Sequence, residues 1–297
     1  MPLGTRSATA LRQKVDVAAA LHSAPPLLPP AAGDDPLPFL LGVVGIFKNE
    51  ALGLAEWIRH YKSQGADHII LLDNGSTDAW QEAVAAAGAA GVHVLPAPEK
   101  HQQAQHYNTH ALPLLAELEV TAVAVVDLDE YLFATGPGET LKTVARSTLS
   151  AGTASQFACP WHMFGSSGHA QQPSSVRVGF TWRRGGVDTV DPPVNFKAVA
   201  LVQHVQRLNV HVHDVWGATA PCPPGLQLNH YPIQSREYFE RAKIGRGDAA
   251  NPAAEALRDW DYFAAYDFKD REDFALRDVA LREEGMAAAL GQPVNNL

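Results

Sequence analysis

Residues 39–73 read FLLGVVGIFKNEALGLAEWIRHYKSQGADHIILLD. Two apolar runs of strand length, 39–47 and 68–73, stand at the ends of this stretch. Between them, apolar side chains recur at the spacing of one helix face, which predicts a helix over 51–64. These side chains are Leu54, Trp57, Ile58 and Tyr61. Two apolar strands joined by a helix indicate a parallel sheet that is covered on both faces.

The same alternation continues toward the middle of the chain. Helices are predicted over 79–91 and 101–118, with a kink or break at Pro113, and strands over 92–97 and 121–129. The predicted fold class is therefore α/β, with a mostly parallel central sheet flanked by helices. Ligands of such sheets bind beyond the carboxyl ends of the strands, so we expect the functional site at that edge.

The fourth predicted strand ends in VVDLDEYLF (125–133), where three carboxylates stand between apolar flanks. Burying such acids is costly unless a cation neutralises them. In an extended segment Asp127 and Asp129 point the same way, so one Mn²⁺ or Mg²⁺ ion could bind both. Such an ion suits the diphosphate of a nucleotide. The alternative is that both acids are solvated in a turn after the strand.

Composition limits the class of protein. The chain has 297 residues, of which 46% are hydrophobic and 19% charged, as in soluble globular proteins. A net charge of -9 argues against a nucleic-acid partner. Cys159 and Cys222 have neither zinc-site nor CxxC spacing, and we expect reduced thiols in a cytoplasmic protein. No apolar stretch is long enough to span a bilayer, although a peripheral contact with the inner face of the membrane stays open.

The pattern divides the chain into three parts. Residues 1–37 are rich in proline and alanine and predict a flexible arm without the features of a signal peptide. Residues 38–250 predict the main domain, with a donor half over 38–135 and an acceptor half over 136–250. Residues 251–297 look like a charged helical tail, for which we predict no catalytic role.

Several of these segments together resemble a known family. KNEALGLAEWIRHYKSQGADHIILLDNGSTD (48–78), followed by VVDLDEYLF, is similar to family 2-like glycosyltransferases with the GT-A fold, and closest to the branch that includes glycosyltransferase family 92. WHMFGSSGH (161–169) and LNHYPIQSREYFERAKIGRG (228–247) are similar to the same branch. The resemblance covers residues 40–247.

The resemblance implies both a fold and a reaction. The fold is GT-A, the Rossmann-like fold of nucleotide-diphospho-sugar transferases. The reaction is metal-dependent transfer of a sugar from a nucleotide-diphosphate sugar, with a UDP-sugar favoured, to a hydroxyl of a glycan or lipid-linked acceptor. The resemblance also implies inversion at the anomeric carbon and a role in polysaccharide biosynthesis.

The resemblance implies a nucleotide pocket at the ends of the first strands. Asp73 has an alternative role in an Asx turn. The alternative for Gln105 and Asn108 is a place on a polar helix face. The expected pocket residues are Lys48, Asn49, Glu50, Asp73, Asn74, Gln105 and Asn108. Lys197 and a basic run farther along add positive charge. Within that run, Lys243 and Arg246 lie beside Gly245 and Gly247, which suggests a loop that closes over the diphosphate; the alternative is a solvated helix face.

Two roles are left open between several residues. The third metal ligand is either one of His211 and His213, which alternate on an apparent strand, or His230; the alternative for the first two is a polar strand face. An inverting reaction also needs a general base. The candidates for it are Glu130, His169 and Asp214. Glu130 has a second interpretation, as a brace for a basic residue, and His169 as a loop histidine bonded to the backbone.

Two other functions compete with glycosyl transfer. A sugar nucleotidyltransferase would carry a G-x-G-T-R-L-like loop after the first strand, where this chain reads GIFKNEALG (45–53). A non-catalytic carbohydrate- or nucleotide-binding relative would have little reason to keep Asp127 and Asp129. The Rossmann and P-loop glycine patterns are absent.

Overall fold

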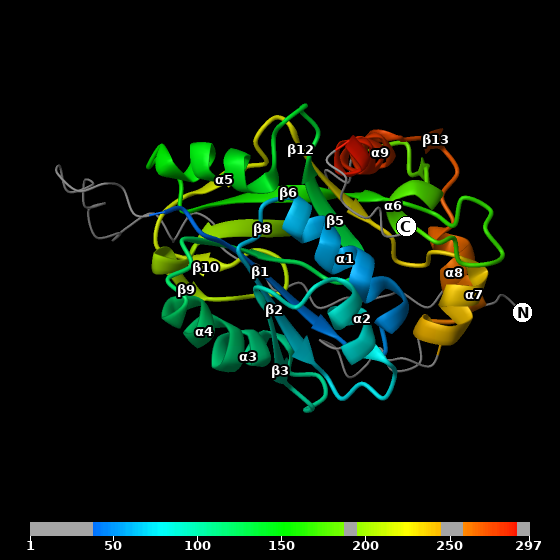
Figure 1. The fold of residues 1–297 in the computed structure, drawn as a ribbon, viewed down its shortest axis with the longest axis horizontal. Helices are drawn as coiled ribbons and strands as arrows, with labels where there is room; N and C mark the ends of the chain where they lie inside the picture. The colour runs from blue at the N-terminus through cyan, green and yellow to red at the C-terminus, as the bar shows by residue number, and fades with distance from the viewer. Residues whose placement is uncertain (1–37, 187–194, 245–257, 290–297) are drawn as a thin grey trace, which may run out of the picture.

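The computed structural model describes residues 38–186, 195–244 and 258–289. Within these ranges the chain forms a nine-stranded mixed sheet with strand order β3-β2-β1-β4-β8-β6-β12-β5, and β11 pairs with β6 (Figure 1). The strands are β1 (Leu41–Phe47), β2 (His68–Asp73), β3 (Val92–Pro96), β4 (Ala122–Val125), β5 (Glu130–Ala134), β6 (Gln156–Met163), β8 (Phe196–Leu201), β11 (Thr219–Pro221) and β12 (Leu226–His230).

Most strand pairs of this sheet are parallel. β3, β2, β1 and β4 run parallel to one another, as do β11, β6 and β12. β8 is antiparallel to both β4 and β6, and β5 is antiparallel to β12. The predicted α/β class with a mostly parallel central sheet is therefore confirmed, and the strands predicted before residue 121 form within one or two residues of their expected bounds.

Helices cover the sheet. They are α1 (Ala51–Ser63), α2 (Trp80–Ala86), α3 (Gln103–His106), α4 (Leu112–Glu117), α5 (Leu141–Ser150), α6 (Val176–Gly179), α7 (Arg236–Tyr238), α8 (Trp260–Tyr266) and α9 (Ala275–Ala289). A π-helical segment, Tyr107–Ala111, joins α3 to α4. Pro113 lies in the first turn of α4, where a missing N–H is tolerated, so this helix does not break at the proline.

Helix α1 connects the core to the acidic stretch. Its predicted apolar face is completely buried against the sheet. From that face the Trp57 indole N–H donates to the Asp127 carbonyl at 3.0 Å, and the Tyr61 hydroxyl donates to the Glu130 carbonyl at 3.0 Å. The Leu132 N–H donates back to the Tyr61 oxygen. His60 Nε2 also lies 3.1 Å from the Leu132 carbonyl, so the helix fixes the backbone of residues 127–132 by four hydrogen bonds.

The C-terminal segment packs on the main domain. Leu276 and Val279 of α9 belong to the same buried cluster as the residues of β1 and α1. Strand β13 (Arg271–Glu272) pairs antiparallel with β7 (Trp182–Arg183). Figure 1 shows α6, α7, α8 and α9 gathered at one end of the sheet. The two helices described in the predicted tail are thus part of the folded body.

The two cysteines form a disulfide, so the prediction of reduced thiols is wrong. Cys159 lies in β6 and bonds Cys222, which is 63 residues away in sequence. β11 pairs with β6, and Pro221 lies opposite Ala158. The residues that follow these two, Cys222 and Cys159, are therefore brought together. The expected cytoplasmic location rested on reduced thiols and loses that support. In the parts of the chain that the structure describes, no helix is long and apolar enough to cross a membrane.

Candidate active site

Residues 127–130 form a turn and not the end of a strand. β4 ends at Val125, and the Glu130 N–H donates to the Asp127 carbonyl at 3.0 Å. The Glu130 side chain also accepts a hydrogen bond from the Asp127 N–H at 2.8 Å. The predicted strand to residue 129 is therefore too long. Asp127 and Asp129 would point the same way only in an extended strand. In the turn, each carboxylate contacts a different lysine.

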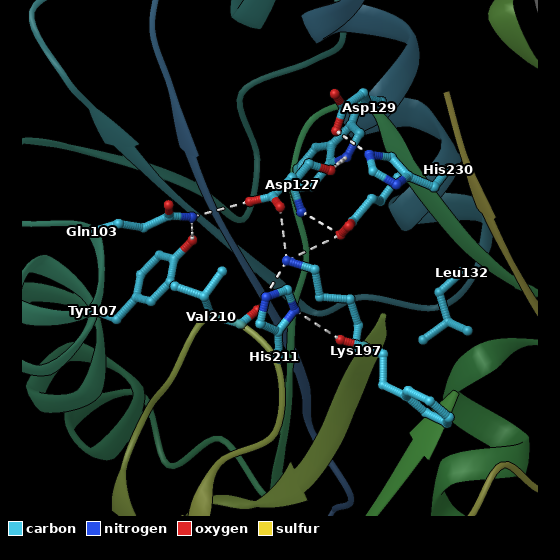
Figure 2. A network of polar contacts seen from close by, with 12 residues as sticks. Gln103, Tyr107, Asp127, Asp129, Leu132, Lys197, Val210, His211 and His230 are labelled. Atoms are coloured by element: carbon cyan, nitrogen blue, oxygen red, sulfur yellow. Dashed lines mark hydrogen bonds and ion pairs between the residues drawn. The ribbon is translucent and has the colours of Figure 1, made fainter. Parts of the chain in front are cut away.

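Asp127 is paired with Lys197 from β8. Lys197 Nζ lies 2.8 Å from Asp127 Oδ2 and 3.3 Å from Glu130 Oε2, and it donates to the Val210 carbonyl at 2.9 Å (Figure 2). The other Asp127 oxygen accepts from Gln103 Nε2 at 3.1 Å. Burial alone would lower the pKa of Lys197, but the two carboxylates outweigh it and raise that pKa above its usual value. Lys197 is therefore a permanent buried cation.

Glu130 braces this cation. Its side chain is fully buried, and burial raises its pKa to about 8 against the opposing effect of Lys197. Glu130 Oε1 is a buried oxygen without a hydrogen-bond partner among the described residues. The contact with Lys197 agrees with the second interpretation of Glu130, as a brace for a basic residue.

Asp129 is paired with Lys243. Lys243 Nζ lies 2.7 Å from Asp129 Oδ2, and His230 Nε2 lies 3.6 Å from Asp129 Oδ1. Burial would raise the pKa of Asp129, but Lys243 and His230 hold it below its usual range. Burial lowers the pKa of His230 to about 4, so its imidazole is neutral near neutral pH. Its ring packs on that of Trp161, with centroids 4.3 Å apart.

A cavity of about 340 Å³ opens above this turn. It lies at the carboxyl ends of β1 and β4, as expected for an α/β sheet. Its acidic and basic lining comprises Glu50, Asp127, Asp129, Arg184, His211, His230, Lys243 and Arg258. Glu50 accepts a hydrogen bond from the Tyr238 hydroxyl at 2.6 Å.

A second wall of the cavity comes from the C-terminal segment, for which the sequence predicted no role. Arg258, Tyr262, Tyr266 and Phe268 line it, and Trp161 of β6 lines the cavity as well. The signal in the sequence was the run WDYFAAYDF (260–268), in which five of nine residues are aromatic. A run so aromatic is unusual for a solvated helix and could have pointed to a binding surface.

Most of the expected nucleotide contacts hold loops together in this structure. Asp73 Oδ1 accepts from the Ser76 N–H at 2.8 Å, which is the alternative Asx-turn role. Asn49 Oδ1 accepts from the Thr77 N–H at 2.7 Å, and Asn74 donates to the Ala97 carbonyl. These contacts join the loops that follow β1, β2 and β3.

Two further amides were expected near the donor. Asn108 donates to the Leu208 carbonyl at 2.8 Å and accepts from the Leu208 N–H at 2.9 Å, so it holds the chain that leads to Val210. Gln105 is exposed on the other face. Among the expected nucleotide residues that the structure describes, Lys48 included, only Glu50 and Lys243 line the cavity. Arg246, Gly245 and Gly247 lie outside the described residues.

Two of the three expected base candidates lie away from the cavity. His169 Nε2 donates to the Gly179 carbonyl at 2.8 Å, and its ring packs on Phe180. This is the alternative of a backbone-bonded loop histidine. Asp214 is exposed on β10 (Asp214–Val215), which pairs with β9 (Val205–Arg207). The side chain of Glu130, the last residue of the turn, is buried in contact with Lys197.

The three histidines that the sequence offers as metal ligands lie in different surroundings. The expected strand over residues 211–213 does not form, and the segment is a bend. His211 lines the cavity, whereas His213 is buried and accepts from the Asn209 N–H at 3.2 Å. Only His230 stands beside an aspartate of the turn.

The arrangement does not fit a preformed site for a divalent cation. Among the described residues, no group of three or more His, Cys, Asp and Glu side chains is placed to hold a metal ion. Both aspartates of the turn accept hydrogen bonds from lysine ammonium groups. The positive charge that these acids require is therefore supplied by the chain itself, and the expected Mn²⁺ or Mg²⁺ stays a prediction.

The chain has an α/β sheet with an acidic turn and a polar cavity at the carboxyl ends of its parallel strands, where ligands of such sheets bind. A model of glycosyltransferase family 92 matches residues 38–184, and this match identifies the domain as a glycosyltransferase. No curated protein matches the chain.

Three solved structures show weak likeness. Mannosyltransferase PcManGT from Pyrobaculum calidifontis, in complex with GDP-Man and Mn²⁺, is 18% identical over 91% of this chain and 80% of that chain, with a TM-score of 0.40. HddC from Yersinia pseudotuberculosis is 10% identical over 68% of this chain and 97% of that chain, at 0.39. Glucosyl-3-phosphoglycerate synthase from Mycobacterium tuberculosis, with Mn²⁺, UDP and glucosyl-3-phosphoglycerate, is 16% identical over 56% of this chain and 57% of that chain, at 0.33. Because TM-scores this low carry little weight, we draw no inference about this chain from them.

Proposed function

We propose that this glycosyltransferase moves a sugar from a nucleotide-diphosphate sugar to a hydroxyl of a glycan or lipid-linked acceptor, with inversion at the anomeric carbon. The observation that carries the proposal is the pairing of Asp129 with Lys243 on the lining of the cavity. It places a cation next to a carboxylate at the carboxyl edge of the parallel strands. A UDP-sugar remains the favoured donor from the family resemblance.

The diphosphate would bind the cations of the cavity. Lys243 and Arg258 both line it, and each offers N–H donors to phosphate oxygens. Positive charge at this place would stabilise the negative charge that develops on the leaving nucleoside diphosphate. Lys197 would act one layer below, by holding the Asp127 carboxylate in its present orientation.

The general base would be one of the groups that line the cavity. Glu50, Asp129 and His230 do so, and each can accept a proton from an attacking hydroxyl. The earlier candidates His169 and Asp214 do not belong to this lining. Asp127 and His211 line the cavity too, but Asp127 is held by Lys197 and Gln103. We therefore propose that the base is one of Glu50, Asp129 and His230.

A resident cation is not a step of this proposal. If Mn²⁺ or Mg²⁺ does bind, Asp127 and Asp129 must first give up their lysine partners, with His230 as the third donor at hand. If the metal displaces the two lysines in this way, the nucleotide should bind only when the metal is present. Binding measured with and without the metal therefore distinguishes the two cases.

The test is a thermal-shift panel. The full chain is mixed with UDP-, GDP- and CDP-sugars, in EDTA and in Mn²⁺, and hits are followed by nucleotide release. We expect one nucleotide class to raise the melting temperature and to be released as the nucleoside diphosphate. Asp214→Asn is the matched control, because that carboxylate is exposed and outside the cavity.

Each alternative predicts a different result. A sugar nucleotidyltransferase would release pyrophosphate from a nucleoside triphosphate. A non-catalytic relative would bind a nucleotide sugar and release nothing when acceptors are supplied. A chain that binds none of the nucleotides, with or without Mn²⁺, would contradict the proposed function. The peripheral membrane contact stays a prediction, which vesicle flotation would test.

A further inference from the structure

The C-terminal wall of the cavity is a continuous aromatic surface. The rings of Tyr262 and Tyr266 are stacked, with centroids 4.4 Å apart and planes 21° apart. Phe268 continues the surface, with its ring centroid 5.9 Å from that of Tyr266. All three side chains are partly exposed and line the cavity. Tyr262 and Tyr266 pack on one side against the cluster that contains Phe239, and the Arg184 guanidinium lies 5.6 Å from the centre of the Phe268 ring. The exposed parts of these rings are the surface that a ligand can cover.

Helix α8 holds this surface in place. Phe263, the residue after Tyr262 in this helix, is buried and packs against Phe239 with ring centroids 5.2 Å apart. The Asp259 side chain accepts from the Tyr262 N–H at 2.9 Å and caps the start of the helix. The aromatic rings are therefore carried by an anchored element.

The loop 164–168 fixes the end of the surface. The Ser166 hydroxyl and N–H donate to Asp267 Oδ1 at 2.6 and 2.8 Å. Gly165 approaches so closely that a Cβ atom there would lie 2.6 Å from the Phe268 nitrogen. The absence of a side chain at Gly165 therefore makes room for the backbone of Phe268.

The rest of the cavity has a different character. Trp161 presents a further aromatic ring, and Arg184 and Arg258 bring guanidinium groups to the same lining. Aromatic faces with a few charged donors at the edge suit a ligand that has an apolar ring face and a rim of hydroxyl groups. A pyranose ring has this chemistry, whereas a lipid chain offers nothing to the guanidinium groups.

We propose that Tyr262, Tyr266 and Phe268 form the acceptor subsite and bind a pyranose ring of a carbohydrate acceptor. The inference rests on the proposed function, because it assumes that the donor diphosphate binds at Lys243. The aromatic surface comes from another part of the chain than the acidic turn, so donor and acceptor would reach the cavity from two sides. The acceptor is thereby assigned to carbohydrates.

The test uses saturation-transfer difference NMR on the full chain. The probes are the methyl pyranosides of glucose, galactose, mannose and N-acetylglucosamine. We expect at least one to receive saturation, mainly at the C–H protons of one ring face. Tyr266→Ala and Phe268→Ala should each weaken its binding about fivefold, and Tyr266→Phe should retain it.

Two controls separate this inference from its alternatives. Trp216→Ala removes an aromatic side chain that is 47% exposed and does not line the cavity, and it should leave the signal unchanged. Each variant is checked for a cooperative melting transition without ligand, which shows that it is folded, and is then tested for the thermal shift with the nucleotide identified for the wild type.

Three results would overturn the inference. The first is no transfer to any of the four pyranosides in the wild type. The second is an undiminished signal in both alanine variants. The third is a parallel loss of nucleotide binding in those variants, which would assign the aromatic surface to the nucleobase of the donor. If the wild type binds pyranosides but no nucleotide, the proposed function fails and the carbohydrate site stands.

Discussion

Lys197 Nζ lies 2.8 Å from the carboxylate of Asp127, and no part of the lysine side chain is exposed. The ammonium group is also 3.3 Å from Glu130, so one buried cation serves two of the three acids in the sequence VVDLDEYLF. This arrangement explains how an apolar chain can place three carboxylates between hydrophobic flanks. Lys243 does the same for the third acid, Asp129.

Replacement of Lys197 should be strongly destabilising. Lys197→Met leaves Asp127 and Glu130 without their buried partner, and we expect a loss of roughly 3–5 kcal/mol in the free energy of unfolding. Denaturant titration measures it. Lys142→Met is the matched control, because Lys142 also lies 2.8 Å from an aspartate, Asp67, but this pair is partly exposed. It should cost at most about 1 kcal/mol. Equal losses in the two variants would contradict the account.

The pKa of Glu130 gives a prediction for pH. Burial raises the pKa of Glu130 in the folded chain to about 8 from its ordinary value of 4.5, so the native state binds this proton more tightly than the unfolded state. The contribution to stability is therefore full below the unfolded pKa and is lost as the pH rises through about 8. Glu130→Gln cannot ionise there and should show a weaker fall in stability between about pH 5 and pH 8.5. Identical pH profiles for the two proteins would rule this out.

The disulfide should stabilise the fold without a part in the chemistry. Cys159 and Cys222 close a loop of 63 residues, and the pair Cys159→Ser with Cys222→Ser should lower the free energy of unfolding by about 2–4 kcal/mol. A thiol titration of the unfolded, unreduced protein should find no free thiol. Two reactive thiols in that experiment would show that the bond is absent.

Gly165 tests the docking of the C-terminal segment. Gly165→Ala should push the backbone at Phe268 away and cost about 1–3 kcal/mol. Gly53→Ala is the control. It lies in α1 with nothing within 4 Å of a new Cβ atom, so it should stabilise the chain by roughly 0.5–1 kcal/mol. Thermal unfolding of both variants measures these changes. If Gly165→Ala leaves the stability unchanged, the C-terminal segment does not pack against residue 165.

Local patterns predicted the parallel half of the fold. The helical spacing from Leu54 to Tyr61 and the apolar runs of β1, β2 and β3 are signals within a few residues, and all of them appear in the structure. The family resemblance added the class of enzyme. It also drew attention to Asp127 and Asp129, which do line one cavity.

Contacts between distant segments could not be predicted in the same way. The disulfide depends on the pairing of β11 with β6, and the cavity wall depends on where α8 packs. The apolar residues on both sides of 127–130 continue the pattern of a strand, so the sequence predicts a strand where the structure has a turn. Its hydrogen bonds to Trp57 and Tyr61 of α1, which favour a turn, are not visible in a linear sequence.

The central claim is that the pair of Asp129 and Lys243 belongs to a nucleotide-diphosphate site. Its most direct test is calorimetric titration of the wild type and Lys243→Ala with UDP, GDP and CDP, once in EDTA and once in Mn²⁺. We predict that one nucleotide binds the wild type in at least one of these conditions and binds the variant at least about tenfold more weakly in the same condition, since a charged hydrogen bond is lost. Equal binding to both proteins, or no binding to the wild type in either condition, would contradict the account.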